Sequence, residues 1–301
     1  MEFPGNFIGI QNTANTNHLS GVHSLYEVGQ GVSDGTWPTN YQIGSSLRFN
    51  GTSNYLTRTP SSLGNRRTFT ISFWHKKTAD DDFPRFQQRV DSNSSQQFTI
   101  SGYTTLNNFR ILDQDGTGAN RCAYHFVGAQ RDVGQWMHIV VAIDTTQEFE
   151  DDRQKVFVNG VFKPIDDGAN SPVNYDRFYE TSVNNTSSNR LLIGCQRPNS
   201  SATLNGFFDG YLAEYYLIDG LQLDASYFGS FHPTTGQWLP KKYTGEFGST
   251  GYYLDFAGTN TSTGAVGTVG EDKSGNDNHF SSNGISSQDV VPDSPTNNFC
   301  I

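Results

Sequence analysis

Acidic side chains are the first candidates for chemistry, because glycoside hydrolysis uses two carboxyl groups, about 5 Å apart in retaining enzymes. No alternating Glu-x-Asp-x-Glu strand that would place such a pair occurs in the chain. Residues 148–152 and 80–82 are acidic, and both runs fit solvated loops with at most weak cation binding. Glu214 lies alone on an expected strand, and one carboxylate is not a catalytic pair. The sequence therefore predicts no catalytic residue and no enzymatic activity, with a polysaccharide-degrading enzyme as the weakest alternative.

Two Asp-rich stretches, 113–116 and 272–278, look like fragments of calcium loops. Neither completes the spacing that ends in a bidentate glutamate, and Asx turns explain both more simply. The seven histidines show no zinc-like spacing, and His138 is expected to be a packed sheet residue. We predict no metal site and no cofactor; calcium bound at a loop rim stays open as an alternative.

The three cysteines, Cys122, Cys195 and Cys300, are far apart and odd in number. They form neither a zinc pattern nor an obvious disulfide framework, so buried or semi-buried free thiols are expected. Residues 1–10 have no basic segment followed by an apolar one, so no secretory signal is predicted. Both observations favour synthesis in a reducing cytoplasm.

Aromatic side chains are the candidates for sugar binding, because their apolar faces stack on pyranose rings while amides and carboxylates fix hydroxyl groups. Four aromatic residues lie in or near expected loops: Trp37, Tyr103, Tyr124 and Tyr175. They are the predicted ligand-binding residues. The alternative is that they are core residues or anchors between subunits, since aromatic residues are also the usual interface anchors.

Composition and charge exclude two classes of function. The chain of 301 residues carries a formal net charge of −10 and has only isolated Lys/Arg pairs, so no phosphate-binding surface is expected and nucleic-acid binding is not predicted. No apolar run approaches the roughly 18 residues that span a bilayer, so no membrane insertion is expected. Gly, Asn, Ser and Thr are abundant and aromatics reach 13%, which suits short strands joined by tight turns around an aromatic core.

Alternating apolar and polar residues predict the elements that position these side chains. Residues 69–75 place Phe69, Ile71 and Phe73 on one face, which predicts a strand with one buried face. Residues 136–144 form the longest aromatic and β-branched run, and 154–162 contain two short strands around Asn159-Gly160. Asn-Gly is the preferred type I′ pair, so a hairpin is predicted there. A short helix is expected only at 223–229.

The order of these segments resembles the LamG-like, concanavalin A-like jelly-roll superfamily. In that superfamily a Trp-x-His strand, a Val-Asn-Gly hairpin, an Ile-Gly strand and a Phe-x-Gly strand recur in this order, as they do here at 136–138, 158–160, 193–194 and 208–217. The resemblance implies an all-β jelly-roll β-sandwich over residues 45–230. An N-terminal arm (1–44) and a small β-rich C-terminal extension (231–301) complete the expected organisation.

The C-terminal extension resembles a module of virion proteins from marine and cyanobacterial phages. The similar segments are 241–245, 251–256, 272–276 and 293–299. The resemblance implies a phage virion surface protein made in the host cytoplasm: a receptor-binding, tail-fibre-type adhesin that binds host surface glycan. The alternative is a capsid decoration, vertex or head-fibre protein that stabilises the particle. Expected partners are further copies of the chain, as a homotrimer, other virion structural proteins and host surface polysaccharide.

Overall fold

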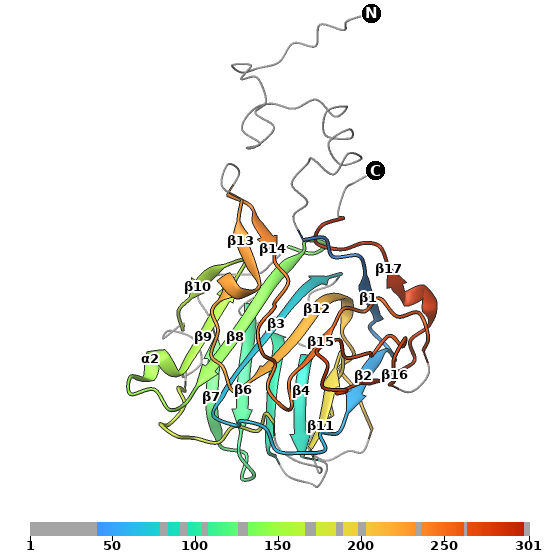
Figure 1. The fold of residues 1–301 in the computed structure, drawn as a ribbon. Coiled ribbons are helices and arrows are strands. Elements are labelled where there is room, and N and C mark those ends of the chain that lie inside the picture. Colours follow the sequence, from blue (N-terminus) through green and yellow to red (C-terminus); the bar gives the residue numbers. More distant parts are fainter. Residues whose placement is uncertain are drawn as a thin grey trace, which may run out of the picture.

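The computed structural model describes residues 41–78, 84–90, 95–103, 108–125, 132–165, 173–184, 189–197, 203–232, 236–261 and 264–297. In these residues, two antiparallel sheets pack face to face as a sandwich (Figure 1). The predicted all-β jelly-roll class is confirmed. No helix in the described ranges is long and apolar enough to cross a membrane.

The first sheet is centred on its two longest strands, Thr68–Lys77 and Asp209–Asp219, and most residues of both strands are buried. Its strands lie in the order β10 (Val161–Lys163), β9 (Gln154–Val158), β8 (Met137–Asp144), β3 (Thr68–Lys77), β12 (Asp209–Asp219), β1 (Ser46–Asn50) and β17 (Val290–Val291), and β15 (Tyr252–Leu254) pairs with β12.

The second sheet lies behind the first and has seven strands in the described chain. Their order is β16 (Ser281–Asn283), β2 (Tyr55–Arg58), β11 (Asn189–Ile193), β4 (Pro84–Val90), β5 (Gln97–Tyr103), β6 (Asn108–Gln114) and β7 (Asn120–His125). A separate hairpin joins β13 (Gly229–Phe231) to β14 (Trp238–Pro240). The short helices are α2 (Glu150–Arg153), η1 (Ala225–Tyr227) and η2 (Ser287–Asp289).

Two of these helices test the sequence-based expectations for loops and helices. The acidic run at 148–152 holds the four-residue α2, none of whose residues is buried, so its acidic side chains are solvated as expected. The helix expected at 223–229 is present as the three-residue η1, whose first turn is capped by the Asp224 carboxylate accepting from the Ser226 amide. The acidic run at 80–82 lies outside the described residues.

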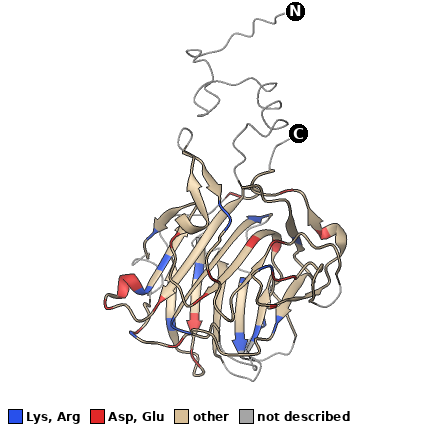
Figure 2. Cartoon of the chain, in the orientation of Figure 1, with Lys and Arg blue, Asp and Glu red and all other residues tan. Residues whose placement is uncertain are grey.

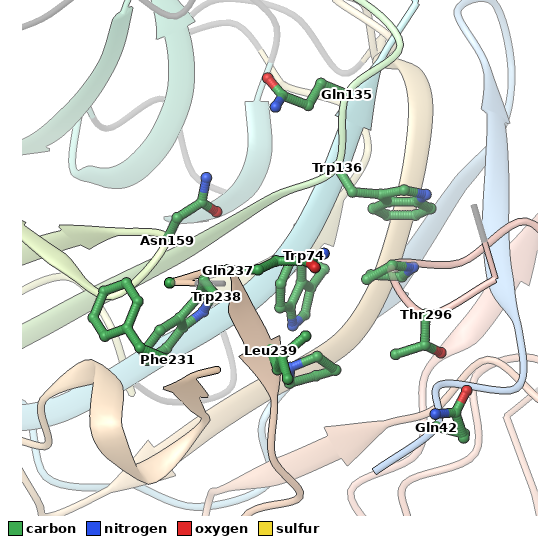
Figure 3. A pocket seen from close by; sticks show the side chains of 13 residues that line it. Gln42, Trp74, Gln135, Trp136, Asn159, Phe231, Gln237, Trp238, Leu239 and Thr296 are labelled. Atoms are coloured by element: carbon green, nitrogen blue, oxygen red, sulfur yellow. The ribbon is translucent and has the colours of Figure 1, made fainter. Parts of the chain in front are cut away.

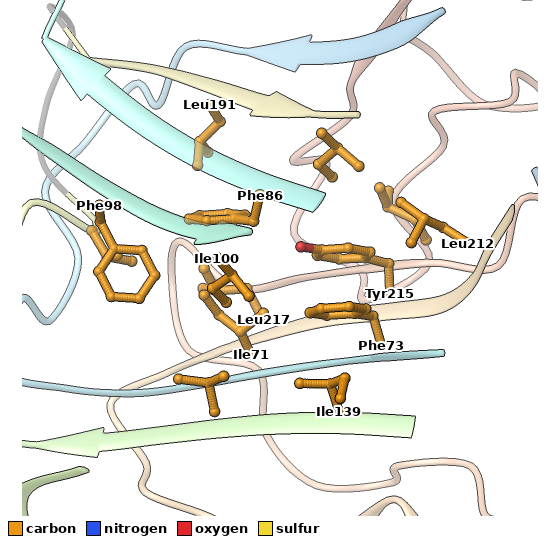
Figure 4. Close-up of a cluster of buried hydrophobic side chains, with 14 of the residues drawn as sticks. Ile71, Phe73, Phe86, Phe98, Ile100, Ile139, Leu191, Leu212, Tyr215 and Leu217 are labelled. Carbon is orange, nitrogen blue, oxygen red and sulfur yellow. The ribbon is translucent and has the colours of Figure 1, made fainter. Parts of the chain in front are cut away.

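An aromatic and aliphatic core fills the space between the sheets (Figure 4). Phe73 on β3 stacks on Tyr215 of β12, with ring centroids 5.0 Å apart and planes nearly parallel. Phe98 from the opposite sheet makes edge contacts with Phe69 at 5.8 Å and with Phe86 at 5.9 Å. The side chains that the alternation of 69–75 assigned to one face therefore do form the core.

The outer face of the first sheet is also buried, which the sequence did not predict. Every residue of β3 from Phe69 to Lys77 is buried, although Thr70, Ser72 and Trp74 had been expected on an open face. The chain from Leu221 onward covers this face: Thr70 Oγ1 donates to the Leu221 carbonyl, and Tyr243 and Tyr253 of the C-terminal extension pack on the same face. The second cluster contains Val140, Tyr216, Ile218, Leu223, Ala225, Phe228, Tyr243 and Tyr253.

The extension is also woven into both sheets. β15 and β17 pair with β12 and β1 of the first sheet, and β16 pairs with β2 of the second. A bulge in β12 accommodates this layer: Glu214 has φ +50° and the register with β3 shifts between Ala213 and Tyr216. The buried Glu214 carboxylate accepts hydrogen bonds from Tyr216 (2.5 Å) and Tyr253 (2.8 Å). Glu214 thus links the bulged strand to the added layer.

Replacing Phe73 by alanine tests the core. The ring is fully buried, so Phe73→Ala should lower the free energy of unfolding by about 3–5 kcal/mol through lost burial and an unfilled cavity. Phe149→Ala is the control, because that ring is 69% exposed and its removal should change stability by less than about 0.5 kcal/mol. Urea unfolding of both variants measures the difference, and equal losses would contradict the core assignment.

Asp113 supplies a second test, through pH. Its buried carboxylate accepts from Ser182 Oγ (2.8 Å) and Tyr175 Oη (3.0 Å), and burial raises its pKa to about 7. Between about pH 4 and 7 the folded state therefore holds a proton that the unfolded chain has released. This contribution to stability is complete below about pH 4 and is lost as pH rises through about 7.

Asp113→Asn should remove that dependence. The difference in unfolding free energy between wild type and variant should change by up to about 1.4 kcal/mol per pH unit across this window, measured by urea titration at several pH values. Asp115→Asn is the control: hydrogen bonds from Thr117 and Arg121 lower the pKa of Asp115, so its contribution is lost only as pH falls below about 4, and its curve should run parallel to wild type between about pH 4 and 7. Parallel pH curves for wild type and Asp113→Asn would contradict the assignment.

Candidate functional site

A cavity of about 610 Å³ lies where the β13–β14 hairpin meets the outer face of the first sheet. Figure 3 shows Trp74 between two walls, one carrying Trp238 and Phe231 and the other Trp136 and Thr296. Its volume falls within the range of about 300–1,000 Å³ that is usual for small-ligand pockets. We call this the tryptophan pocket; its lining is Gln42, Trp74, Gln135, Trp136, Asn159, Phe231, Gly236, Gln237, Trp238, Leu239, Pro240, Pro295 and Thr296.

The predicted Asn-Gly hairpin turn forms the base of the Trp238 wall. Asn159 and Gly160 have φ of 47° and 78°, which confirms the predicted turn with positive φ at both central residues. The Trp238 ring lies directly over Gly160, so a Cβ atom there would come within 2.3 Å of Trp238 Cε3. Glycine is therefore required twice, for the turn geometry and for the close approach of the indole.

His138 contacts both Trp74 on the pocket floor and Trp238 on the wall beside it. Its ring centroid is 4.9 Å from that of Trp74 and 6.0 Å from that of Trp238, with interplanar angles of 30° and 22°. Trp238 Nε1 donates to His138 Nδ1 at 3.1 Å, and His138 Nε2 lies 2.8 Å from Ser72 Oγ. Because an indole N–H only donates, Nδ1 accepts and the neutral ring carries its proton on Nε2, which donates to Ser72.

Burial keeps His138 neutral. The side chain is 1% exposed, and burial lowers its pKa to about 3. The bond from Trp238 therefore persists from neutral to mildly acidic pH. His138 is a packed sheet residue, as the sequence predicted, and it fixes the orientation of the indoles above it.

The C-terminal segment holds the opposite wall. Trp136 Nε1 donates to Asp293 Oδ1 at 3.1 Å, and Lys76 forms an ion pair with the same carboxylate. Lys76 Nζ also lies over the Tyr211 ring at 4.6 Å and over the Trp136 ring at 5.3 Å. Trp136 is therefore held by two separate contacts, the hydrogen bond to Asp293 and the Lys76 ammonium over its ring.

The rim is closed where the first and last described segments meet. The Ile43 amide donates to Thr296 Oγ1 at 2.8 Å, and Ser294 Oγ donates to the Ile43 carbonyl at 2.6 Å. These bonds place Gln42 and Thr296 side by side at the pocket edge. Segments more than 250 residues apart in sequence thus build one side of the pocket.

The chemistry that this lining offers is stacking and hydrogen bonding. Three indoles and one phenyl ring supply apolar faces, while side-chain amides and a hydroxyl supply donors and acceptors. Among the residues that the structure describes, the lining has no Asp, Glu, His, Cys, Lys or Arg. The described lining can stack on a ring and exchange hydrogen bonds with it, and it offers no Asp, Glu, His, Cys, Lys or Arg side chain for proton transfer or nucleophilic attack.

The side chains of two of the four aromatic residues predicted from the sequence are described by the structure, and neither lines the tryptophan pocket. Trp37 and the side chain of Tyr103, the last residue of β5, are outside the described part of the structure. Tyr124 and Tyr175 are 3% and 1% exposed, and their hydroxyls donate to the Lys163 carbonyl and to Asp113. Their rings are packed in the core, so these two tyrosines offer no face to a sugar. For these two tyrosines the alternative interpretation, that they are core residues, is therefore the correct one, and the prediction of ligand binding is wrong.

The sequence did contain weak signals for the actual pocket. The Trp-x-His strand supplies Trp136 and His138, and the Val-Asn-Gly hairpin supplies Asn159. Both motifs predict elements of the fold, a strand and a hairpin, and the structure contains both elements. Trp238 lies near the start of the expected C-terminal extension, and nothing in its neighbours in sequence indicates that it packs on Gly160.

The Asp-rich stretches form Asx turns. Asp115 accepts from the Thr117 and Ala119 amides and from Arg121, and Asp272 accepts from the Tyr253, Ser274 and Asn278 amides. Within the described residues, no group of three or more His, Cys, Asp or Glu side chains is placed to hold a metal ion. Cys122 and Cys195 are buried free thiols, as predicted, while Cys300 lies outside the described residues.

Comparisons with known proteins agree with the two-sheet architecture. Two solved structures are similar to this chain: domain 4 of the arabinanase AbnA from Geobacillus stearothermophilus, solved with arabinotriose (18% identity, TM-score 0.44, 62% of this chain and 75% of that chain), and a pentraxin from Limulus polyphemus (14% identity, TM-score 0.41, 61% of this chain and 79% of that chain). A Bacteroides ovatus protein named for carbohydrate binding is 11% identical with a TM-score of 0.50, covering 83% of this chain and 60% of that chain. It shows the shared fold. No curated protein matches the chain significantly.

The family profile is more specific than these structural likenesses. The Laminin_G_3 profile, described as the concanavalin A-like lectin/glucanases superfamily, matches residues 50–220, more than half of the chain. The matched region holds the core strands from β2 to β12, in the order in which the motifs occur. The chain therefore belongs to the concanavalin A-like lectin/glucanase superfamily.

Proposed function

We propose that the chain is a non-catalytic saccharide-binding protein and that the tryptophan pocket is its binding site. The observation that carries this proposal is the convergence of Trp74, Trp136 and Trp238 on one cavity edged by side-chain amides. Indole faces match the apolar C–H faces of sugar rings, and amides can donate to and accept from hydroxyl groups. The volume suits a ligand of mono- or disaccharide size.

Rigidity supports this assignment. Trp238 is bonded to His138 and rests on Gly160, and Trp136 is bonded to Asp293. A site whose rings are already ordered loses little conformational entropy when a ligand binds. The Bacteroides ovatus protein of the same fold, named for carbohydrate binding, makes saccharides the natural ligand class to test.

Binding without cleavage follows from the described lining. Hydrolysis of a glycosidic bond needs a carboxyl pair on either side of the scissile bond, and the described lining contains no carboxylate. Glu214, the acidic residue that the sequence placed on a strand, is buried and accepts bonds from two tyrosines. It is part of the fold's interior rather than of the pocket.

We further propose that the protein is carried on a phage particle as a receptor-binding adhesin. The support is the resemblance of the C-terminal extension to a phage virion module, whose residues Tyr243 and Tyr253 belong to the layer that covers the first sheet. A homotrimer, as expected from the sequence, would present three pockets and raise the avidity for a repeating glycan. The alternative is a capsid decoration protein whose pocket holds a neighbouring virion chain.

Substitution of the pocket rings tests the binding proposal. Trp238→Ala should weaken binding at least about tenfold, because a stacking face is lost. Gln237→Ala is the second variant: its side chain is exposed, so the fold should be unaffected and binding should weaken about two- to tenfold. Binding is measured first on an array of immobilised oligosaccharides and then by calorimetry with the best array ligand.

Phe162→Ala is the matched control, because Phe162 is 46% exposed on β10 and lies outside the pocket lining. It should bind like wild type. Unchanged affinity in both pocket variants, or no binding to any saccharide, would contradict the proposal.

The location on a particle is tested separately. Antibodies against the full chain should label purified phage particles in immunogold electron microscopy. Label at the tail supports the adhesin, and label over the capsid supports the decoration protein. Absence of the chain from washed particles, checked by mass spectrometry, would contradict both.

A further inference from the structure

We propose that the tryptophan pocket selects uncharged saccharides and discriminates against acidic ones such as uronic and sialic acids. This inference rests on the proposed saccharide binding and names the ligand class of the same site. It follows from the charge of the lining, from the pairing of the charged groups that contact Trp136 and from the charge of the whole chain.

The described lining carries no formal charge. Its polar side chains are the amides of Gln42, Gln135, Asn159 and Gln237 and the hydroxyl of Thr296. Each of these groups both donates and accepts hydrogen bonds, as hydroxyl and acetamido groups of neutral sugars also do. A carboxylate only accepts hydrogen bonds, and its strongest partner is a cation: an Arg guanidinium that binds both carboxylate oxygens, or a Lys ammonium. No lining residue of the described chain provides such a cation.

The two charged groups that contact Trp136 are paired with each other. Lys76 has 9% of its side chain exposed and forms an ion pair with Asp293. The Asp293 carboxylate also accepts from Trp136 Nε1, and Lys76 Nζ lies over the Trp136 ring, so the two charges beside this wall compensate each other. His138 lies under Trp238 and is neutral at working pH, so it adds no positive charge to the floor.

An acidic sugar would therefore lose water without gaining a counter-charge. Removing a carboxylate from water without a paired cation is far more costly than removing a hydroxyl that finds an amide partner. Binding an acidic sugar in the same position would leave its charge either buried and unpaired or displaced toward solvent. Either outcome weakens binding relative to the neutral analogue.

The field of the whole protein acts in the same direction. The chain has a formal net charge of −10, and a net negative protein repels anionic ligands and slows their association. Figure 2 shows no charged residue on the two strands of the β13–β14 hairpin, and it shows the acidic residues of α2 elsewhere on the molecule. The two exposed lysines that follow β14, Lys241 and Lys242, lie outside the lining: Lys241 Nζ donates to the Ser226 carbonyl at 3.4 Å, and Lys242 Nζ lies over the Tyr253 ring at 5.7 Å.

The experiment compares matched neutral and acidic ligands on the full chain. Calorimetry at physiological salt would use galactose and galacturonate oligomers of equal length, which differ only at C6, and lactose against sialyllactose, which adds one acidic residue to the same disaccharide. The neutral member of the binding pair should bind at least about tenfold more tightly. Equal or tighter binding of the acidic member would overturn this inference while leaving saccharide binding intact. Absence of binding to every neutral and acidic ligand would overturn the proposed function as well.

A charge placed in the pocket gives the second arm. Gln135→Arg adds a cation at an exposed lining position, and it should shift the acidic-to-neutral affinity ratio by about tenfold toward the acidic ligand. Gln288→Arg is the matched control, because it adds the same charge at an exposed position in η2, outside the lining. A ratio that shifts equally in both variants would show that net charge, and not the pocket, sets the preference, and would overturn the inference.

Discussion

The burial of the first sheet on both faces is the constraint on which the remaining structure depends. A sheet that faced water on its outer side would leave Trp74, His138 and Tyr216 exposed, and it would have no pocket. The C-terminal extension prevents this by adding a third layer, fixed by the bond from Tyr253 to Glu214 and by the Lys76–Asp293 ion pair. Both anchors tie the extension to strands of the sandwich, so the layer and the sheet form one packed unit. The pocket lies at the seam between them.

A seam of this kind explains why the pocket is both aromatic and polar. Its floor is the outer face of β3 and β8, where Trp74 and His138 pack as they would in a core. Its rim is made of turns and segment ends, where Gln42, Asn159 and Thr296 keep polar groups near water. Hydrophobic packing therefore fixes the rings, and the surrounding loops provide the hydrogen-bonding groups. Ligand sites in general have the same composition: apolar walls hold the ligand, and a few polar groups orient it.

The fold was largely predictable from the sequence, and the site was not. Alternation over 69–75 and positive φ at Asn159-Gly160 depend on local chemistry, which a sequence displays directly. The second buried face of β3 depends on a layer that arrives about 150 residues later, so no local pattern reveals it. The pocket residues come from segments scattered between Gln42 and Thr296, and only the tertiary structure brings them together. Tyr124 and Tyr175 show the converse failure, because proximity to an expected loop says little about whether a ring is packed in the core.

An uncharged pocket on an acidic protein also constrains how such a molecule can work. Hydrogen bonds between amides and hydroxyls replace bonds to water and so contribute little each, about 0.5–1.5 kcal/mol. Without a charge-assisted contact, a single pocket of this type gains most of its affinity from ring stacking and is expected to bind weakly. Weak binding at each pocket suits a ligand with repeating units. Once one pocket has bound such a ligand, binding at a second, linked pocket is intramolecular, and the overall affinity rises. Under the proposed saccharide binding, the chemistry of the pocket fits a polysaccharide with repeating units, bound by several linked copies of the chain, better than a free sugar bound by one copy.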